Sequence, residues 1–327
     1  MDMLSVIVPV HNGQHYLESV VQQLLAEQLV SFEIIFVDNN STDKTWAILL
    51  KLANQYNFVQ ILKEDKLGAS AARNRGYLAA KGEFIYFFDV DDLLIQGSLV
   101  KMQNLLVLHP EAACVYGNRI VVKNRHECLK IEKEVSYALE KPPTCGLMWF
   151  KNFSLLSGPP AFMHRRCKLE KWGLFPEHMR IGEDAFFHIR LGLNEKMIHL
   201  KTPVYMYYRH LESTVTKNNK LSSRTSIYWK QYINTYLPYY FQEKTPLVFD
   251  MLLFRKIQGS YLKLLLEPNK IRNRYRLFKR LEMEILPLRV SFYFKCLAVL
   301  LILTGSTKMY KLCVYYLLSK KSLKNES

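Results

Sequence analysis

The sequence predicts an α/β fold in which a mostly parallel sheet lies between helices and a basic helical extension follows. Three observations lead to this prediction. Short apolar segments alternate with helical patterns, polar residues follow each apolar segment, and positive charge gathers at the rear of the chain. A chain of 327 residues is long enough for one large domain and an extension.

The front of the chain alternates between expected strands and expected helices. We expect strands at Leu4–Val10, Phe32–Val37, Phe58–Leu62, Glu83–Phe88, Cys114–Val122 and Pro203–Tyr208, and helices at Tyr16–Leu29, Ser70–Ala80 and Ala185–Leu193. Residues 123–141 are interpreted as a polar excursion. Because ligands bind beyond the carboxyl ends of parallel strands, the polar residues after the first, second and fourth strands are expected to share one binding edge.

Charge divides the chain into two predicted domains. Residues 1–216 hold 24 basic and 23 acidic residues, a net charge of +1, and form the expected α/β domain. Residues 217–327 hold 21 basic and 6 acidic residues, a net charge of +15, and form the expected helical region, which is also rich in aromatic residues. Six scattered cysteines without CxxC spacing, and no recognisable signal peptide, favour free thiols in the cytoplasm.

Three carboxylates follow the fourth expected strand, at Asp89, Asp91 and Asp92. An Asp-x-Asp pair at the end of a strand suits a hard divalent cation, and a plain acidic turn is the competing interpretation. A phosphatase would require Gly-Thr after the second aspartate, where this chain has Asp92 and Leu93. We expect Asp92 to cap the helix that begins near Gln96.

Other polar residues have both a binding and an ordinary interpretation. Asp38 could accept a hydrogen bond from a base or ribose, or serve only in a turn. Arg73 near a helix start could bind an anion or lie on the surface. The Glu183–Asp184 pair could supply a general base or an ordinary helix N-terminal charge. His210 could ligate a metal or be structural, and the absence of GxGxxG and P-loop motifs disfavours nicotinamide, flavin and P-loop chemistry.

Five motifs in order give the sequence a specific resemblance over about residues 4–216. They are VIVPVHNG (6–13), IIFVDNNSTD (34–43), GASAARNRG (68–76), FFDVDD (87–92) and GEDAFF (182–187). Together they resemble glycosyltransferase family 2, the inverting nucleotide-sugar transferases of GT-A fold. The bacterial surface polysaccharide type is the expected setting, and the resemblance implies a UDP-sugar donor, Mn²⁺ or Mg²⁺, and a hydroxyl of a glycan acceptor.

The resemblance also implies roles for individual residues. Those that would line the nucleotide and donor-sugar pocket are Pro9, Val10, His11, Glu18, Asp38, Arg73, Asp89 and Val90. Asp91 would ligate the metal and His210 would complete its shell. Asp184 matches the catalytic base of the family, and Glu183 would lie near the acceptor.

Some positions depart from the family pattern. His11 stands where Tyr is common, and Asn39 replaces the second Asp of the frequent DDGS motif. The QxxRW signature of processive synthases is absent, which favours transfer of one sugar at a time. A non-catalytic sugar-nucleotide-binding module attached to a membrane is the alternative function.

The basic rear lies outside the catalytic pattern. Its most apolar stretch, Leu286–Leu303, contains Arg289 and Lys295, and its uninterrupted core is far shorter than the roughly 20 residues that a spanning helix needs. We interpret it as helices at an anionic membrane surface, which would suit a polyprenyl-linked acceptor at the inner face of the cell membrane. A helical lid or a dimerising domain is the competing interpretation. No nucleic-acid module is recognised, so nucleic acid is not an expected partner.

Overall fold

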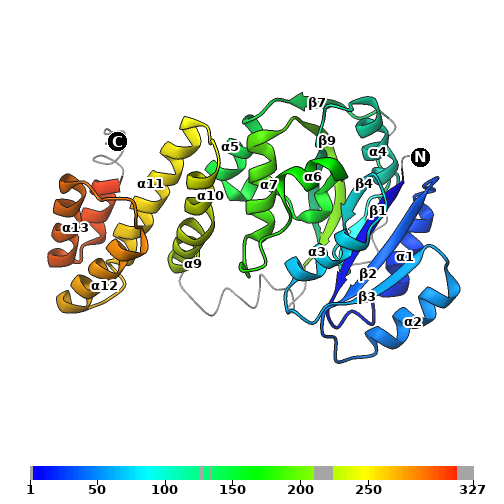
Figure 1. Cartoon of the computed structure of the whole chain (residues 1–327), viewed down its shortest axis with the longest axis horizontal. Coiled ribbons are helices and arrows are strands. Elements are labelled where there is room, and N and C mark those ends of the chain that lie inside the picture. Colours follow the sequence, from blue (N-terminus) through cyan, green and yellow to red (C-terminus); the bar gives the residue numbers. More distant parts are fainter. Residues whose placement is uncertain (1–2, 125–128, 133, 210–223, 315–327) are drawn as a thin grey trace. The chain divides into compact units, whose positions relative to one another are not determined.

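Short apolar segments rich in β-branched residues form the strands of a nine-stranded mixed sheet in the front unit of the chain. The structure is a computed structural model that describes residues 3–124, 129–132, 134–209 and 224–314. The chain divides into two compact units, Met1–Ser213 and Thr214–Ser327 (Figure 1). The predicted boundary between residues 216 and 217 lies outside the described residues.

The sheet of the first unit confirms the predicted α/β class. Its strands are β1 (Leu4–Val10), β2 (Phe32–Asp38), β3 (Val59–Lys63), β4 (Phe84–Phe87), β5 (Leu93–Leu94), β6 (Cys114–Val122), β7 (Tyr137–Glu140), β8 (Phe162–Arg165) and β9 (Met197–Tyr208). They are ordered β3-β2-β1-β4-β8-β6-β9-β5, and β7 pairs with β9. Strands β3, β2, β1 and β4 are mutually parallel, whereas β8 is antiparallel to both of its neighbours, β4 and β6.

The register of the parallel strands brings their carboxyl ends to one edge. Val10 at the end of β1 lies opposite Asp38 at the end of β2, and Ile7 lies opposite Phe87 at the end of β4. The backbone continues this pairing, since Phe88 N donates to Ile7 O at 2.9 Å. The polar residues that follow these three strands are therefore neighbours.

Helices pack around the sheet of the first unit (Figure 1). They are α1 (Leu17–Ala26), α2 (Thr45–Gln55), α3 (Ala69–Ala79), α4 (Ser98–Leu108), α5 (Thr144–Lys151), α6 (Arg166–Trp172) and α7 (Glu183–Asn194), with short 3₁₀ turns at Phe153–Leu155 and Pro159–Ala161. Successive residues of a strand point to opposite faces, and Val6, Ile7 and Val8 are all fully buried. Helix α3 approaches β1 closely, because a Cβ atom at Gly76 would lie only 2.4 Å from Ile7 Cγ2.

Two expectations about the later strands were wrong. Residues 123–141, interpreted as a polar excursion, contain β7, which pairs with β9 from Tyr137↔Leu200 to Glu140↔Met197. Strand β9 begins at Met197 rather than at Pro203. Strand β7 is a short edge strand with no buried residue, so its sequence carries little of the apolar signal that marks a central strand.

The expected cap of α4 was also wrong. The buried carboxylate of Glu27, at the end of α1, accepts hydrogen bonds from Gly97 N at 2.6 Å and Leu99 N at 2.8 Å. It therefore satisfies the free N–H groups at the start of α4 from a distant part of the chain. Asp92 instead accepts from Tyr208 N on β9 at 3.1 Å.

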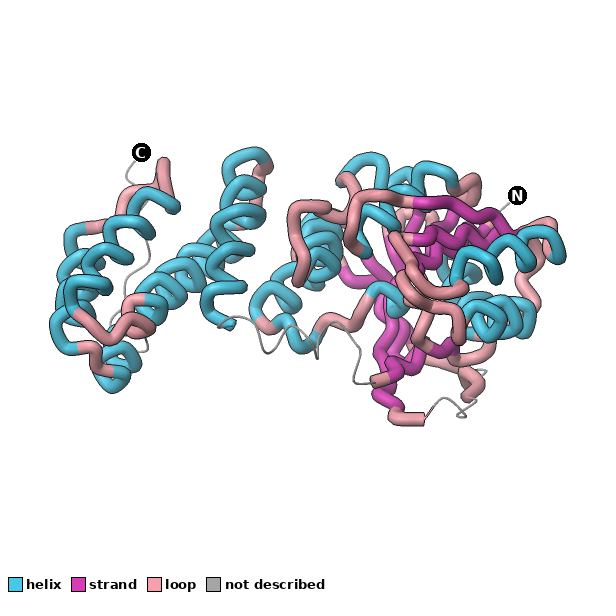
Figure 2. Tube along the Cα trace, turned by 90° about the horizontal axis from the view of Figure 1, so that it is seen from below, coloured by secondary structure: helices cyan, strands magenta, loops and turns pink. Residues whose placement is uncertain are grey.

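The second unit is helical, as predicted (Figure 2). Its elements are α9 (Arg224–Gln231), the π-helical turn η3 (Tyr232–Tyr236), α10 (Leu237–Gln242), α11 (Leu247–Leu264), α12 (Ile271–Glu284), α13 (Phe292–Thr304) and α14 (Thr307–Leu312). Tyr261 of α11 is fully buried in this unit, with its ring against Phe278 and Phe294 and its hydroxyl donating to Phe278 O. Within the described residues, no helix has the length and apolar character needed to cross a bilayer. The five cysteines described there and in the first unit are free thiols.

Candidate active site

The loops after β1 and β2 are joined by hydrogen bonds at the edge of the sheet. His11 Nδ1 lies 2.8 Å from the Asn39 carbonyl oxygen, to which it can donate, and Asn12 Oδ1 accepts from Thr42 N at 2.8 Å. The buried Asp38 side chain accepts from Ser41 N at 3.2 Å. Pro9 and Val10 end β1 immediately before His11. The structure thus brings together four of the residues predicted to line the nucleotide pocket.

Asn39 connects this edge to the loop before α3. Its amide nitrogen donates to the carbonyl oxygens of Glu64 and Lys66, both at 2.8 Å, and its amide oxygen accepts from Gly68 N at 2.8 Å. A carboxylate could accept but could not donate at this position. The Asn that replaces the frequent second Asp therefore has a structural role in this chain.

Arg73 of α3 joins carboxylates from two other elements. Its NH2 group donates to Asp89 Oδ1 at 2.7 Å, and its NH1 group lies 3.7 Å from Glu183 Oε1. The guanidinium is almost fully buried, and within the described part of the chain no group accepts a hydrogen bond from its Nε or NH1. Buried donors without acceptors are costly, and these two are suited to an anionic ligand.

A loop that the sequence analysis did not single out supports Arg73. The Phe175 ring lies 5.2 Å from the guanidinium carbon of Arg73, and the Asn74 side chain both donates to Phe175 O and accepts from Phe175 N. Asn74 also donates to Glu177, whose carboxylate pairs with Lys66 Nζ at 2.6 Å. Only the tertiary structure shows these contacts, because Asn74 and Phe175 lie about 100 residues apart in the chain.

Burial sets the electrostatics of Glu183 and Asp184 in the first turn of α7. Burial, followed by the charge of Asp184, raises the pKa of Glu183 to about 7, although Arg73 opposes the shift. Burial also raises the pKa of Asp184, and Arg73 again opposes it. A carboxylate with a raised pKa is a stronger proton acceptor than an ordinary carboxylate, which suits the role of a general base.

The Asp89–Asp92 turn crowds carboxylates at the same edge. Burial, together with the charges of Asp89 and Asp91, raises the pKa of Asp92 well above its ordinary range. Excess negative charge and carboxylate oxygens suit a hard cation such as Mg²⁺ or Mn²⁺. Among the residues that the structure describes, no three His, Cys, Asp or Glu side chains could hold a metal together. A cation at Asp91 would therefore need further ligands, such as phosphate oxygens and water.

Three other predicted site residues have different surroundings. Val90 is buried against the loop after β1, since a Cβ atom at Gly13 would lie 3.4 Å from Val90 Cγ1. Glu18 is exposed in the first turn of α1, and within the described residues no hydrogen bond joins it to the other predicted site residues. His210 lies outside the described residues.

Comparisons with known proteins agree with the family that the sequence motifs indicated. The family model described as glycosyl transferase family 2 matches residues 5–168. Glycosyltransferase GlyG of Streptococcus pneumoniae is 36% identical over 118 residues, which cover 36% of this chain and 39% of GlyG. The Escherichia coli UDP-Glc:alpha-D-GlcNAc-diphosphoundecaprenol beta-1,3-glucosyltransferase WfgD is 29% identical over 122 residues, which cover 37% of this chain and 47% of WfgD. The match thus spans less than half of either relative.

A solved structure shares the fold at low sequence identity. The crystal structure of residues 1–349 of TarS from Staphylococcus aureus, in complex with UDP-GlcNAc, aligns with a TM-score of 0.65 and 15% identity. The alignment covers 99% of this chain and 93% of that chain. The comparison supports the mixed α/β architecture with a helical C-terminal region.

Proposed function

Because the chain belongs to glycosyltransferase family 2, we propose that it transfers a hexose or N-acetylhexosamine from a UDP-sugar to a hydroxyl of a glycan acceptor, with inversion at the anomeric carbon. The observation that carries the proposal is the position of Arg73 between Asp89 and Glu183 at the binding edge of the sheet. A UDP-sugar is supported by the UDP-GlcNAc complex of TarS and by the name of WfgD.

The nucleotide would lie along the ends of β1 and β2. Asp38 would accept from the uracil edge, while Pro9, Val10 and His11 would line the pocket and Glu18 would contact the ribose or base. Asp89 and Val90 would face the ribose or donor sugar. The two buried donors of Arg73 that lack acceptors, Nε and NH1, would bind the nucleotide or its phosphates.

The reaction is a single displacement. An acceptor hydroxyl attacks the anomeric carbon from the face opposite the diphosphate, and the bond to the diphosphate oxygen breaks as the new bond forms. Asp184 takes the hydroxyl proton, and its raised pKa makes it a better proton acceptor than an ordinary carboxylate. Glu183 lies beside the acceptor, and Arg73 holds Asp89 in place. A divalent cation bound at Asp91, with His210 as a further ligand, would supply positive charge for the departing diphosphate.

The acceptor is proposed to be linked to a polyprenyl lipid at the inner face of the cell membrane. The name of WfgD describes a diphosphoundecaprenol-linked acceptor, which supports this assignment. The net charge of +15 over residues 217–327 supports peripheral attachment to an anionic surface. The protein would then act in cell-surface polysaccharide or glycoconjugate synthesis.

The first test is donor turnover without an acceptor. The purified chain is incubated with a panel of UDP-sugars and Mn²⁺, and UDP release is measured with and without EDTA. We expect slow release from one sugar, loss of that release with EDTA, and loss in Asp91→Asn but not in Asp65→Asn, an exposed control carboxylate. Absence of release together with retained UDP binding in calorimetry would favour the non-catalytic module. Absence of both would contradict the proposal.

A further inference from the structure

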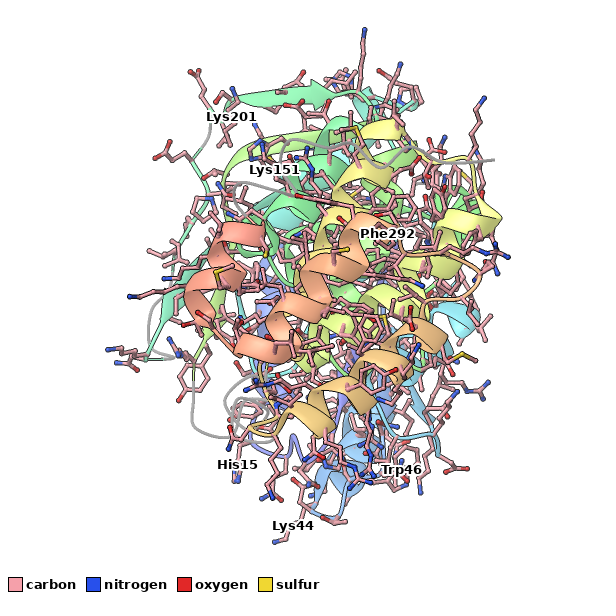
Figure 3. The ribbon with its side chains drawn as sticks, turned by 90° about the vertical axis from the view of Figure 1, so that its left-hand side faces the viewer. His15, Lys44, Trp46, Lys151, Lys201 and Phe292 are labelled. Carbon is pink, nitrogen blue, oxygen red and sulfur yellow. The ribbon has the colours of Figure 1, made fainter. Side chains whose placement is uncertain are left out.

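Helix α13 is apolar on the side that faces solvent as well as on the side that packs. The buried side of the helix consists of Phe294, Leu297, Ala298, Leu301 and Ile302. The ring of Phe294 lies edge-to-face with that of Tyr261, with 5.3 Å between the ring centroids. On the opposite side, Phe292 is 83% exposed, Val299 45% and Leu303 60%. These three residues are spaced by seven and four positions, so they form one stripe along the helix. We call this stripe the α13 face; its first residue, Phe292, is labelled in Figure 3.

An exposed apolar stripe of this kind needs an explanation. A helix that is apolar all round is normally buried completely or lies in a membrane. With 13 residues, α13 is about 20 Å long, shorter than the roughly 30 Å hydrocarbon core of a bilayer. It is therefore too short to span a bilayer, although it has the length of a helix that lies in the interface.

The chain segments that precede and follow the α13 face carry only positive charges. Between Ile285 and Val314 the chain has four basic residues and no acidic residue. Arg289 precedes the helix, and Lys308 and Lys311 follow it on α14. All three of these residues are exposed. The fourth, Lys295, is paired with Glu282 of α12 at 3.1 Å. Cationic side chains therefore flank the apolar stripe at both ends.

We propose that the α13 face docks onto an anionic lipid bilayer, with Phe292, Val299 and Leu303 inserted at the boundary of headgroups and acyl chains. Arg289, Lys308 and Lys311 would then lie at the level of the anionic headgroups. A second copy of this chain is a poorer partner, because its face would bring the same positive charges together. The proposal names the contact surface for the peripheral attachment proposed above, and it does not depend on the transfer reaction.

The test compares two pairs of exposed apolar residues in the full chain. Binding to phosphatidylcholine vesicles, with and without phosphatidylglycerol, is measured by flotation. We expect wild type to bind the vesicles that contain phosphatidylglycerol. The affinity of Phe292→Ser/Leu303→Ser for these vesicles should be lower by about tenfold or more. The matched control is Leu247→Ser/Val248→Ser on α11, whose side chains are 72% and 53% exposed. It should bind as wild type does.

Charge and self-association are tested in the same experiment. Lys308→Gln/Lys311→Gln should weaken binding to the anionic vesicles, and added salt should weaken binding of wild type. Wild type that does not float, or a Phe292/Leu303 variant that floats equally well, would overturn the proposal. So would a wild-type oligomer in solution that this variant converts to a monomer, because a second copy would then cover the face. UDP release in the absence of vesicles reports separately on the proposed reaction and should be the same in all four proteins.

Discussion

The guanidinium of Arg73 binds Asp89 through a 2.7 Å hydrogen bond while it lies 3.7 Å from Glu183. The three side chains come from α3, from the turn after β4 and from the first turn of α7. One buried cation thus stabilises carboxylates on both sides of the candidate site. Removal of either partner from a buried ion pair leaves an uncompensated charge, which is strongly destabilising.

Substitution of Arg73 by Met should therefore destabilise the protein in a pH-dependent way. We expect a loss of about 3 kcal/mol in the free energy of unfolding at pH 8 and a smaller loss at pH 5. Without the guanidinium, the pKa values of Glu183 and Asp184 rise further, so their ionisation at high pH costs more. Urea denaturation at both pH values measures the difference. Arg75→Met, an exposed arginine on the same helix, is the control, and an equal loss at both pH values would contradict this account.

Asp184→Asn should separate donor binding from catalysis. The amide keeps the size of the side chain and can still accept from Ala185 N, which Asp184 Oδ1 does at 2.8 Å. It cannot take a proton from the attacking hydroxyl, so UDP release should fall by about 100-fold or more. UDP affinity, measured by calorimetry, should change little. Retained turnover would remove Asp184 from the mechanism.

The pKa of Glu183 predicts how the free energy of unfolding responds to pH. The folded-state pKa of about 7 is above the ordinary value of 4.5, so its contribution to stability is present below pH 4.5 and is lost as pH rises through 7. Glu183→Gln should remove this loss. Between pH 5 and pH 8, the free energy of unfolding of the variant should therefore rise relative to that of wild type by on the order of 2 kcal/mol. Denaturation of the ligand-free protein across this range measures it. A parallel pH dependence in the two proteins would show that Glu183 ionises normally.

The same carboxylates should shape the rate profile of the wild-type enzyme. Because burial raises the pKa of Asp184, and that of Glu183 to about 7, UDP release should continue to increase above pH 5 rather than level off there, as it would with an ordinary carboxylate. A rate that is already constant at pH 5 would show that the base has an ordinary pKa. This measurement needs only the donor that the panel identifies.

Asn39→Asp should weaken the link between the loop after β2 and the loop before α3, at the proposed nucleotide pocket. The carboxylate would face the Glu64 and Lys66 carbonyl oxygens, to which Asn39 now donates. We expect a loss of about 2 kcal/mol in the free energy of unfolding, together with weaker UDP binding. Asn54→Asp, on the exposed side of α2, is the control. Unchanged UDP affinity in Asn39→Asp would show that the loop is held by other contacts.

The sequence by itself determined the elements whose signal is local. Strand β6 has the predicted bounds of Cys114–Val122, and α3 differs from its prediction by one residue at each end. The binding edge was also predictable, because parallel strands with short βα connections must place their carboxyl ends together. The motif order was enough to predict the family that residues 5–168 match.

Only the tertiary structure decided which side chains meet. Nothing in the spacing showed that Arg73 would lie between Asp89 and Glu183, that Glu27 rather than Asp92 would cap α4, or that Phe175 would pack against Arg73. Each of these contacts joins parts of the chain that are distant in sequence. The periodicity of apolar residues indicates which face of an element is buried, but not which neighbour covers it. A hydrogen bond or an ion pair is decided by that neighbour.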